Sequence, residues 1–268
     1  MNNDFVIVTS LYNLKKVKRN DNRDWEDYLN WFAKTLQVKC PFIIFTEEET
    51  VDFIKDKRKN LPTHIITTKL EDVPLYSLKD KIQNILDSEE YKSQMTDCSR
   101  VECQESIYSV IQYSKFKWIV ESCKINPFES KYFFWLDAGA SRFLSDDDIE
   151  NEYPSAEALS QLGEIDNTFL LQYNPDYYPD LVNADLLLES YFYDNRSFIC
   201  GSMFGGNSEA IKNVDKEMDI IFDKMISNKC INNEQIALGY LCKSKPDLFT
   251  KFYRKNPKEH LSLFQEMA

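Results

Sequence analysis

The chain has 268 residues, of which 43% are hydrophobic and 14% aromatic, and its 32 basic and 44 acidic side chains give a formal net charge of −12. This composition predicts a globular protein and excludes a disordered polymer. The acidic balance argues against nucleic acid and anionic membrane surfaces as partners, because both bind clustered Lys and Arg.

The sequence lacks several kinds of segment and motif. No run approaches the roughly 18 apolar residues that cross a bilayer, and the first residues lack the basic start of a secretory signal. The seven cysteines are scattered without a Cys-x-x-Cys pair, the only histidines are His64 and His260, and the six glycines form no phosphate-binding motif. We therefore expect a soluble, cytoplasmic protein without a transmembrane segment, folded as a single domain over 1–268.

Apolar runs alternate with helical patterns along the chain. Continuous apolar runs predict buried strands at 5–9, 42–46, 64–68, 132–136, 169–173 and 198–206. Apolar residues at helical spacing predict a helix from Trp25 to Leu36 that is capped by Asp24, helices between about 75 and 125, a long helix at about 207–228, and another after Asn233. The alternation predicts an α/β fold, a Rossmann-type α/β sandwich with a mainly parallel central sheet.

The run at 132–136 ends in Asp137, which is followed by the small residues Ala138, Gly139 and Ala140. A buried strand that delivers a carboxylate at its carboxyl end is typical of ligand sites in α/β sheets. Mg²⁺ and Mn²⁺ prefer one or two carboxylates together with substrate phosphates, so Asp137 is a candidate metal ligand. The alternative is that Asp137 caps the loop that follows.

The segment NPFESKYFFWLDAGASRF at 126–143 resembles the signature of the HtrL/YibB-like family, whose members are associated with surface-polysaccharide genes. So do the segments at 27–48 and 114–119, and the similarity runs from residue 5 to about residue 242. That family in turn resembles GT-A glycosyltransferases, which bind a nucleotide sugar and use a divalent metal on an Asp-x-Asp motif. Asp137-Ala138-Gly139 takes the position of this motif, with Gly139 in place of the second aspartate.

The resemblance implies residues for the donor. Nucleotide-sugar contacts are expected from Thr9, Ser10, Tyr12, Lys115, Asp137, Ala138, Gly139 and Arg142. Tyr12 would stack on the base, and Lys115 would neutralise the diphosphate and stabilise the leaving group. Arg142 is the alternative phosphate contact, ranked below Lys115. The alternatives are that Tyr12 packs in the core and that Lys115 is a solvated helix residue.

The resemblance also implies residues for the sugar, the acceptor and the metal. The sugar or acceptor pocket would contain Gly201, Ser202, Gly205, Gly206 and Gln235. Glu234 and Asp137 would be catalytic, with Glu234 as acid or base, and His260 would join Asp137 as a metal ligand. The glycines could instead mark close backbone approach, Glu234 could stabilise a helix start, and His260 could be a solvated tail residue.

Two further segments are rich in tyrosine and acidic residues. The segments 173–180 and 189–196 mix tyrosines with carboxylates, which suits either carbohydrate or an ordinary packed loop. We interpret the acidic run at 146–152 as a solvated helix start.

Together these features predict the transfer of a sugar from a nucleoside-diphosphate sugar, with a UDP-sugar favoured, to a hydroxyl of a glycan or glycoconjugate. The reaction would be assisted by Mn²⁺ or Mg²⁺ and would serve polysaccharide biosynthesis. One alternative is a catalytically inactive module that binds carbohydrate or nucleotide. Another is a metal-dependent nucleotidyltransferase or phosphatase.

Overall fold

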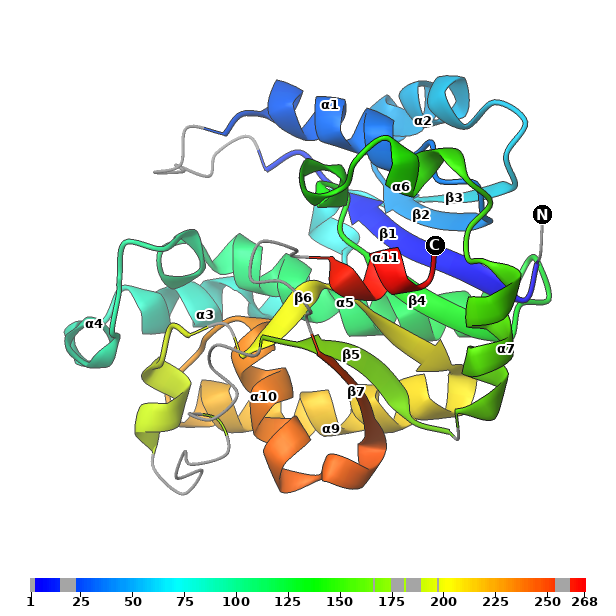
Figure 1. The fold of residues 1–268 in the computed structure, drawn as a ribbon. Coiled ribbons are helices and arrows are strands. Elements are labelled where there is room, and N and C mark those ends of the chain that lie inside the picture. Colours follow the sequence, from blue (N-terminus) through cyan, green and yellow to red (C-terminus); the bar gives the residue numbers. More distant parts are fainter. Residues whose placement is uncertain are drawn as a thin grey trace.

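The computed structural model describes residues 3–14, 23–165, 167–174, 181, 189–196, 198–253 and 261–268 (Figure 1). Its strands are β1 (Phe5–Leu11), β2 (Phe42–Thr46), β3 (Thr63–Thr67), β4 (Tyr132–Leu136), β5 (Phe169–Tyr173), β6 (Ile199–Asn207) and β7 (Phe249–Tyr253). Its helices are α1 (Trp25–Thr35), α2 (Val51–Arg58), α3 (Lys79–Leu86), α4 (Glu89–Gln94), α5 (Ser106–Ile125), α6 (Asp147–Glu150), α7 (Ala156–Glu164), α9 (Ser208–Ser227), α10 (Glu234–Ser244) and α11 (Ser262–Glu266).

The strands form one sheet in the order β3-β2-β1-β4-β6-β5-β7. Strand β1 is parallel to both of its neighbours, and the β2–β3 and β5–β7 pairs are parallel as well. Only β6 runs antiparallel to its neighbours, β4 and β5. The predicted mainly parallel α/β fold is therefore confirmed. Because the chain proceeds from β1 to β2 on one side and β4 lies on the other, the carboxyl ends of β1 and β4 form the topological switch point at which such sheets bind ligands.

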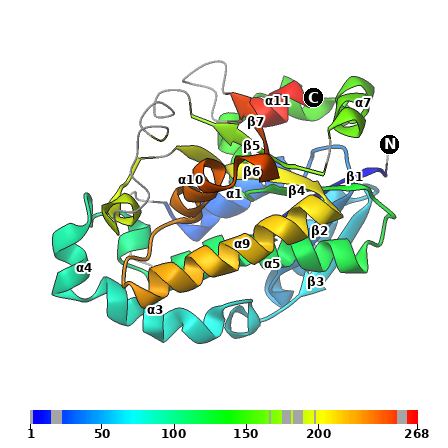
Figure 2. The ribbon, with the colours of Figure 1, turned by 90° about the horizontal axis from the view of Figure 1, so that it is seen from below.

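Both faces of the sheet are covered by helices, which explains why its central strands are apolar throughout. On β1, Val6 and Val8 belong to a core that includes residues of α3, α5, α9 and α10, whereas Phe5 and Ile7 face residues of α1, α2, α7 and α11. Figure 1 shows α1 and α2 on one side of the sheet and α9 and α10 on the other. Figure 2 shows α3, α5 and α9 side by side. This three-layer packing places α5 and α10 beside the switch point.

Each predicted strand appears within two residues of its expected bounds. Strand β7 was not predicted, because its sequence FTKFY is neither a continuous apolar run nor a regular alternation of apolar and polar residues; it pairs with β5 at the edge of the sheet. All seven cysteines are free. Within the described part of the chain, no helix has the length and apolar character needed to span a membrane.

Candidate functional site

A cavity of about 570 Å³ lies at the switch point. It is bordered by residues 10–14 at the end of β1, by residues 137–139 after β4, and by side chains from α1, α5 and α10. Loops at the carboxyl ends of parallel strands converge here, so residues distant in sequence come together at one place.

Three charged side chains at the wall of this cavity, Lys115, Asp137 and Glu234, form what we call the buried triad. Lys115 Nζ lies 2.9 Å from Asp137 Oδ1 and 2.7 Å from Glu234 Oε1, and it donates a hydrogen bond of 3.1 Å to the carbonyl oxygen of Gly201. Lys115 and Glu234 are 6% and 1% exposed, whereas the side chain of Asp137 is 32% exposed. An ammonium group has three donors, so those of Lys115 are all committed within the protein.

The electrostatics of the buried triad keep Lys115 charged. Burial alone would lower the pKa of Lys115, but Asp137 and Glu234 together hold that pKa above its ordinary value. Burial raises the pKa of Glu234, with Lys115 opposing the shift and Asp137 adding to it. A carboxylate with a raised pKa is a stronger base, which suits proton transfer.

One carboxylate oxygen of Glu234 accepts no hydrogen bond from the described residues. This oxygen, Oε2, is buried. The neighbouring Gln235, which also lines the cavity, has a buried Oε1 in the same condition. Buried acceptors without partners are rare, and these two would be satisfied by a ligand with hydroxyl groups.

Asp137 is held by its neighbours. Trp135 Nε1 donates a hydrogen bond of 2.7 Å to Asp137 Oδ1, the same oxygen that faces Lys115. The backbone N–H of Asp137 donates to the carbonyl oxygen of Ser202 on β6, at 2.9 Å. These contacts fix the direction of the carboxylate at the cavity wall.

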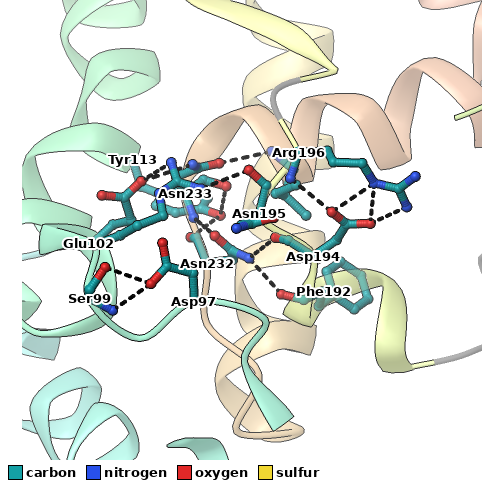
Figure 3. Close-up of polar contacts among 12 residues, drawn as sticks. Asp97, Ser99, Glu102, Tyr113, Phe192, Asp194, Asn195, Arg196, Asn232 and Asn233 are labelled. Atoms are coloured by element: carbon teal, nitrogen blue, oxygen red, sulfur yellow. Dashed lines mark hydrogen bonds and ion pairs between the residues drawn. The ribbon is translucent and has the colours of Figure 1, made fainter. Parts of the chain in front are cut away.

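The position of Glu234 is set by a polar network at the start of α10 (Figure 3). Asn233 caps the helix through its side-chain oxygen, and its Nδ2 donates to the buried Glu102 Oε1 at 3.3 Å. Asn232 donates to two backbone carbonyls of the segment 192–194, at 2.8 and 2.7 Å. Because Glu234 is the first residue of α10, this network orients it toward the cavity.

Arg142 brings a second cation to the cavity. It lies in the short 3₁₀ segment Ala140–Phe143, and its guanidinium carbon is 5.0 Å from the centre of the Trp31 ring and 4.8 Å from that of Phe143. Nε and Nη1 of Arg142 are buried, and neither has a hydrogen-bond partner in the part of the chain that the structure describes. Burial and the nearby Arg23 lower the pKa of Arg142, although a guanidinium stays charged at neutral pH. Unused cationic donors at a cavity wall point to an anionic ligand.

The described residues do not fit the expected divalent metal site. Asp137 already contacts an ammonium, and a Cβ atom placed on Gly139 would lie 3.8 Å from Arg142 Nε, so the position of the missing second aspartate borders another cation. Within the described ranges, no group of three His, Cys, Asp or Glu side chains could hold a metal ion. His260, the other predicted ligand, lies outside the described residues.

The end of β1 matches the expectations only in part. Ser10 and Tyr12 line the cavity, as does Ala138. Tyr12 is 6% exposed, and its ring stacks on Trp118 with centroids 5.6 Å apart and planes at 9°, so one ring face is already occupied. Burial raises the pKa of Tyr12 to about 12. Thr9 is fully buried and does not line the cavity.

The accessible rings of the cavity were missed by the sequence analysis. Half-buried Trp25 and Tyr28 from α1 and Tyr108 from α5 line it. Trp25 and Tyr28 follow the helical apolar spacing of α1, which predicted core packing. No local signal distinguishes a ring on a core face from one at the edge of a cavity.

Two residues of the glycine-rich segment do border the buried triad. Ser202 lines the cavity, and the carbonyl oxygen of Gly201 accepts a hydrogen bond from Lys115. A Cβ atom at Gly201 would lie 2.6 Å from Glu234 Oε1 and 2.9 Å from Gln235 Nε2. A side chain at position 201 would therefore displace the side chains of Glu234 and Gln235.

Gly205 and Gly206 are placed elsewhere, and the structure does not bring them to the cavity. A Cβ atom at Gly205 would lie 2.2 Å from the carbonyl oxygen of Phe133 on β4, and one at Gly206 would lie 3.0 Å from that of Thr168. Their location agrees with the alternative interpretation, in which glycine permits close backbone approach.

Gly205→Ala is expected to destabilise the fold by about 1–3 kcal/mol, because the added methyl group would force β4 away from β6. Gly163→Ala in α7 is the matched control, since its nearest neighbour would be 3.9 Å away, and alanine there should be neutral or stabilising by up to about 1 kcal/mol. Urea unfolding of both variants measures the difference. Equal midpoints for Gly205→Ala and the wild type would contradict this explanation.

Taken together, the two tyrosine-rich segments are only partly described by the structure. Residues 175–180 of the first tyrosine-rich segment are outside the described residues. In the second, Tyr191 and Tyr193 are buried, and the hydroxyl of Tyr191 donates to the carbonyl oxygen of Ile236 in α10. That segment is therefore a packed support of α10, and its tyrosines do not form a carbohydrate surface.

The fold and the cavity define an α/β protein with a cavity at the carboxyl edge of a mainly parallel sheet. The chain belongs to the HtrL_YibB family, described as "Bacterial protein of unknown function", whose pattern it matches over residues 3–264. No curated protein matches it. Among solved structures, mouse xyloside xylosyltransferase 1 in its apo form is similar, with a TM-score of 0.47, 12% identity, and coverage of 93% of this chain and 85% of that chain. This likeness is distant, and the function proposed below rests on the residues of the cavity.

Proposed function

We propose that the protein is a glycosyltransferase that moves a sugar from a nucleoside-diphosphate sugar to a hydroxyl of a glycan or glycoconjugate. The observation that carries this proposal is that one cavity offers both the unpartnered donors of Arg142 and the unpartnered carboxylate oxygen of Glu234. The donors suit phosphate oxygens, and the carboxylate oxygen suits a hydroxyl group. A nucleotide sugar and its acceptor carry both kinds of group.

The location and the rings of the cavity support a nucleotide-sugar donor. Mononucleotides and dinucleotides bind at switch points of α/β sheets, where this cavity lies. Trp25, Tyr28 and Tyr108 offer aromatic surface to a base or to the apolar face of a sugar. A UDP-sugar remains the favoured donor from the sequence analysis.

The buried triad can support the transfer step. The acceptor oxygen would attack the anomeric carbon, the bond from that carbon to the diphosphate oxygen would break, and the acceptor proton would pass to Glu234 Oε2. Arg142 would meet the charge that develops on the departing diphosphate. Lys115 would hold Asp137 and Glu234 in place, and the exposed side of Asp137 would bind a sugar hydroxyl.

Incubation of the purified protein with a panel of UDP- and GDP-sugars tests the proposal. We expect release of the nucleoside diphosphate that increases when a glycan acceptor is added, and loss of this release in Asp137→Ala with the unfolding curve retained. Release of nucleoside monophosphate or inorganic phosphate would instead indicate a nucleotidyltransferase or a phosphatase. Binding of the nucleotide sugar without turnover would indicate a binding module.

A further inference from the structure

We infer that Arg142 supplies the positive charge that faces the diphosphate, so that binding of the donor needs no divalent cation. This inference rests on the proposed function, and it departs from the cation that the sequence analysis predicted. It follows from three features of the cavity: the engagement of Asp137, the surroundings of Gly139 and the unused donors of Arg142.

The first feature is that Asp137 is already engaged. Its Oδ1 faces Lys115 Nζ at 2.9 Å and Trp135 Nε1 at 2.7 Å. A divalent cation on this carboxylate would lie next to a buried ammonium, where low dielectric strengthens repulsion between like charges. Displacing Lys115 would break an ion pair that also holds Glu234 in place.

The second feature is the residue that replaces the second aspartate of an Asp-x-Asp motif. A Cβ atom on Gly139 would lie 3.5 Å from the Trp31 ring and 3.8 Å from Arg142 Nε. A guanidinium therefore borders the position at which that motif would carry an anion. Trp31 and Phe143 pack against this guanidinium and hold it there.

The third feature is that Lys115 and Arg142 differ in how many of their hydrogen-bond donors have partners within the protein. Lys115 has its three donors committed to Asp137, Glu234 and the carbonyl oxygen of Gly201. Arg142, in contrast, keeps Nε and Nη1 without a hydrogen-bond partner among the described residues. A guanidinium presents its donors as a planar fork that matches two phosphate oxygens. Arg142, rather than Lys115, is therefore the diphosphate contact.

Calorimetric titration distinguishes diphosphate binding by the protein's own cationic side chain from binding that requires a metal ion. UDP and GDP are titrated with EDTA and, separately, with Mn²⁺, and pyrophosphate is titrated with EDTA only. We expect Kd values for the nucleotides that agree within about threefold between the two conditions. Arg142→Met should weaken binding of all three probes by about 10- to 100-fold, because charge-assisted hydrogen bonds are lost. Lys34→Met is the matched control and should change nothing, because Lys34 pairs with Asp146 and does not line the cavity.

Gly139→Asp provides a second test. The new carboxylate would lie beside Arg142 and occupy its donors, so binding of pyrophosphate in EDTA should weaken about tenfold. Unchanged or tighter binding in this variant would overturn the inference, as would Arg142→Met with wild-type affinity.

The remaining outcomes distinguish the inference from the proposed function. Binding of UDP or GDP only when Mn²⁺ is present would overturn the inference and leave the proposed function standing. Binding of pyrophosphate through Arg142 without binding of either nucleotide would support the inference and overturn the proposed donor. If no probe binds under any condition, both are overturned.

Discussion

Glu234→Gln is expected to lower kcat by about 100- to 10,000-fold, the usual contribution of a positioned general base. The amide has nearly the same shape as the carboxylate but cannot take up the proton of the acceptor hydroxyl. Lys115 keeps Asp137 as a partner in this variant, so the buried triad should not collapse. Initial rates with saturating donor and acceptor measure the effect.

The pH profile of activity shows whether Glu234 acts as a base or only stabilises the start of α10. Burial raises the pKa of Glu234 above its usual 4.5, so Glu234 retains its proton at a pH at which an exposed glutamate would have lost it. Activity should therefore fall with decreasing pH already above 4.5, and this limb should be absent in Glu234→Gln. Because the pKa of Glu234 is higher in the folded state than in the unfolded state, protonation of Glu234 contributes to the free energy of unfolding at low pH. This contribution is lost as the pH rises through the pKa of Glu234 in the folded protein.

Glu209→Gln is the matched control for Glu234→Gln. Glu209 lies in the first turn of α9, behind the capping residue Asn207, and is exposed. It should retain wild-type turnover and the wild-type acid limb. If Glu234→Gln also retained both, Glu234 would only stabilise the helix start.

Lys115→Met is expected to destabilise the fold by about 3–5 kcal/mol, the usual cost of removing one partner from a buried ion pair. The substitution would leave Asp137 and Glu234 without their shared cation, and Glu234 is almost fully buried. Urea unfolding at neutral pH measures the loss. Lys117→Met, on the same helix but partly exposed, pairs with Asp215 and Asp219 and should cost only about 1 kcal/mol.

A double variant tests whether loss of the Lys115 charge causes the destabilisation expected for Lys115→Met. Adding Glu234→Gln to Lys115→Met removes one of the stranded carboxylates, so the double variant should be more stable than Lys115→Met alone. The two effects should therefore not add, as is usual for contacting residues. Additive losses would show that Lys115 acts through its packing and not through its charge.

The cavity would recognise phosphate without a glycine-rich cradle. The chain has only six glycines, and none forms a phosphate-binding loop. Gly201, Gly205 and Gly206 instead permit close packing around β6. Recognition then depends on a side chain, Arg142, whose guanidinium packs against the rings of Trp31 and Phe143.

The fold could be predicted from the sequence because its signal is local. Runs such as FVIVT and YFFWL are apolar at every position, and such runs need cover on both faces, which indicates a parallel sheet between helices. The same reasoning placed Asp137 at a strand end, where a ligand site is expected. Strand β7 was not predicted, because FTKFY is neither a continuous apolar run nor a regular alternation of apolar and polar residues.

The roles of individual side chains were decided by tertiary structure. Lys115 and Glu234 are separated by 119 residues, and only the packing of α5 against β4 and β1 and of α10 against β6 makes them a buried pair. The family resemblance implied that Tyr12 stacks on a base, and the alternative for Lys115 was a solvated helix residue, whereas the structure buries both side chains and stacks Tyr12 on Trp118. Burial, donor satisfaction and pKa depend on neighbours that are remote along the chain, and for this reason the sequence alone determined the sheet and its strand-end carboxylate but not the electrostatics of the cavity.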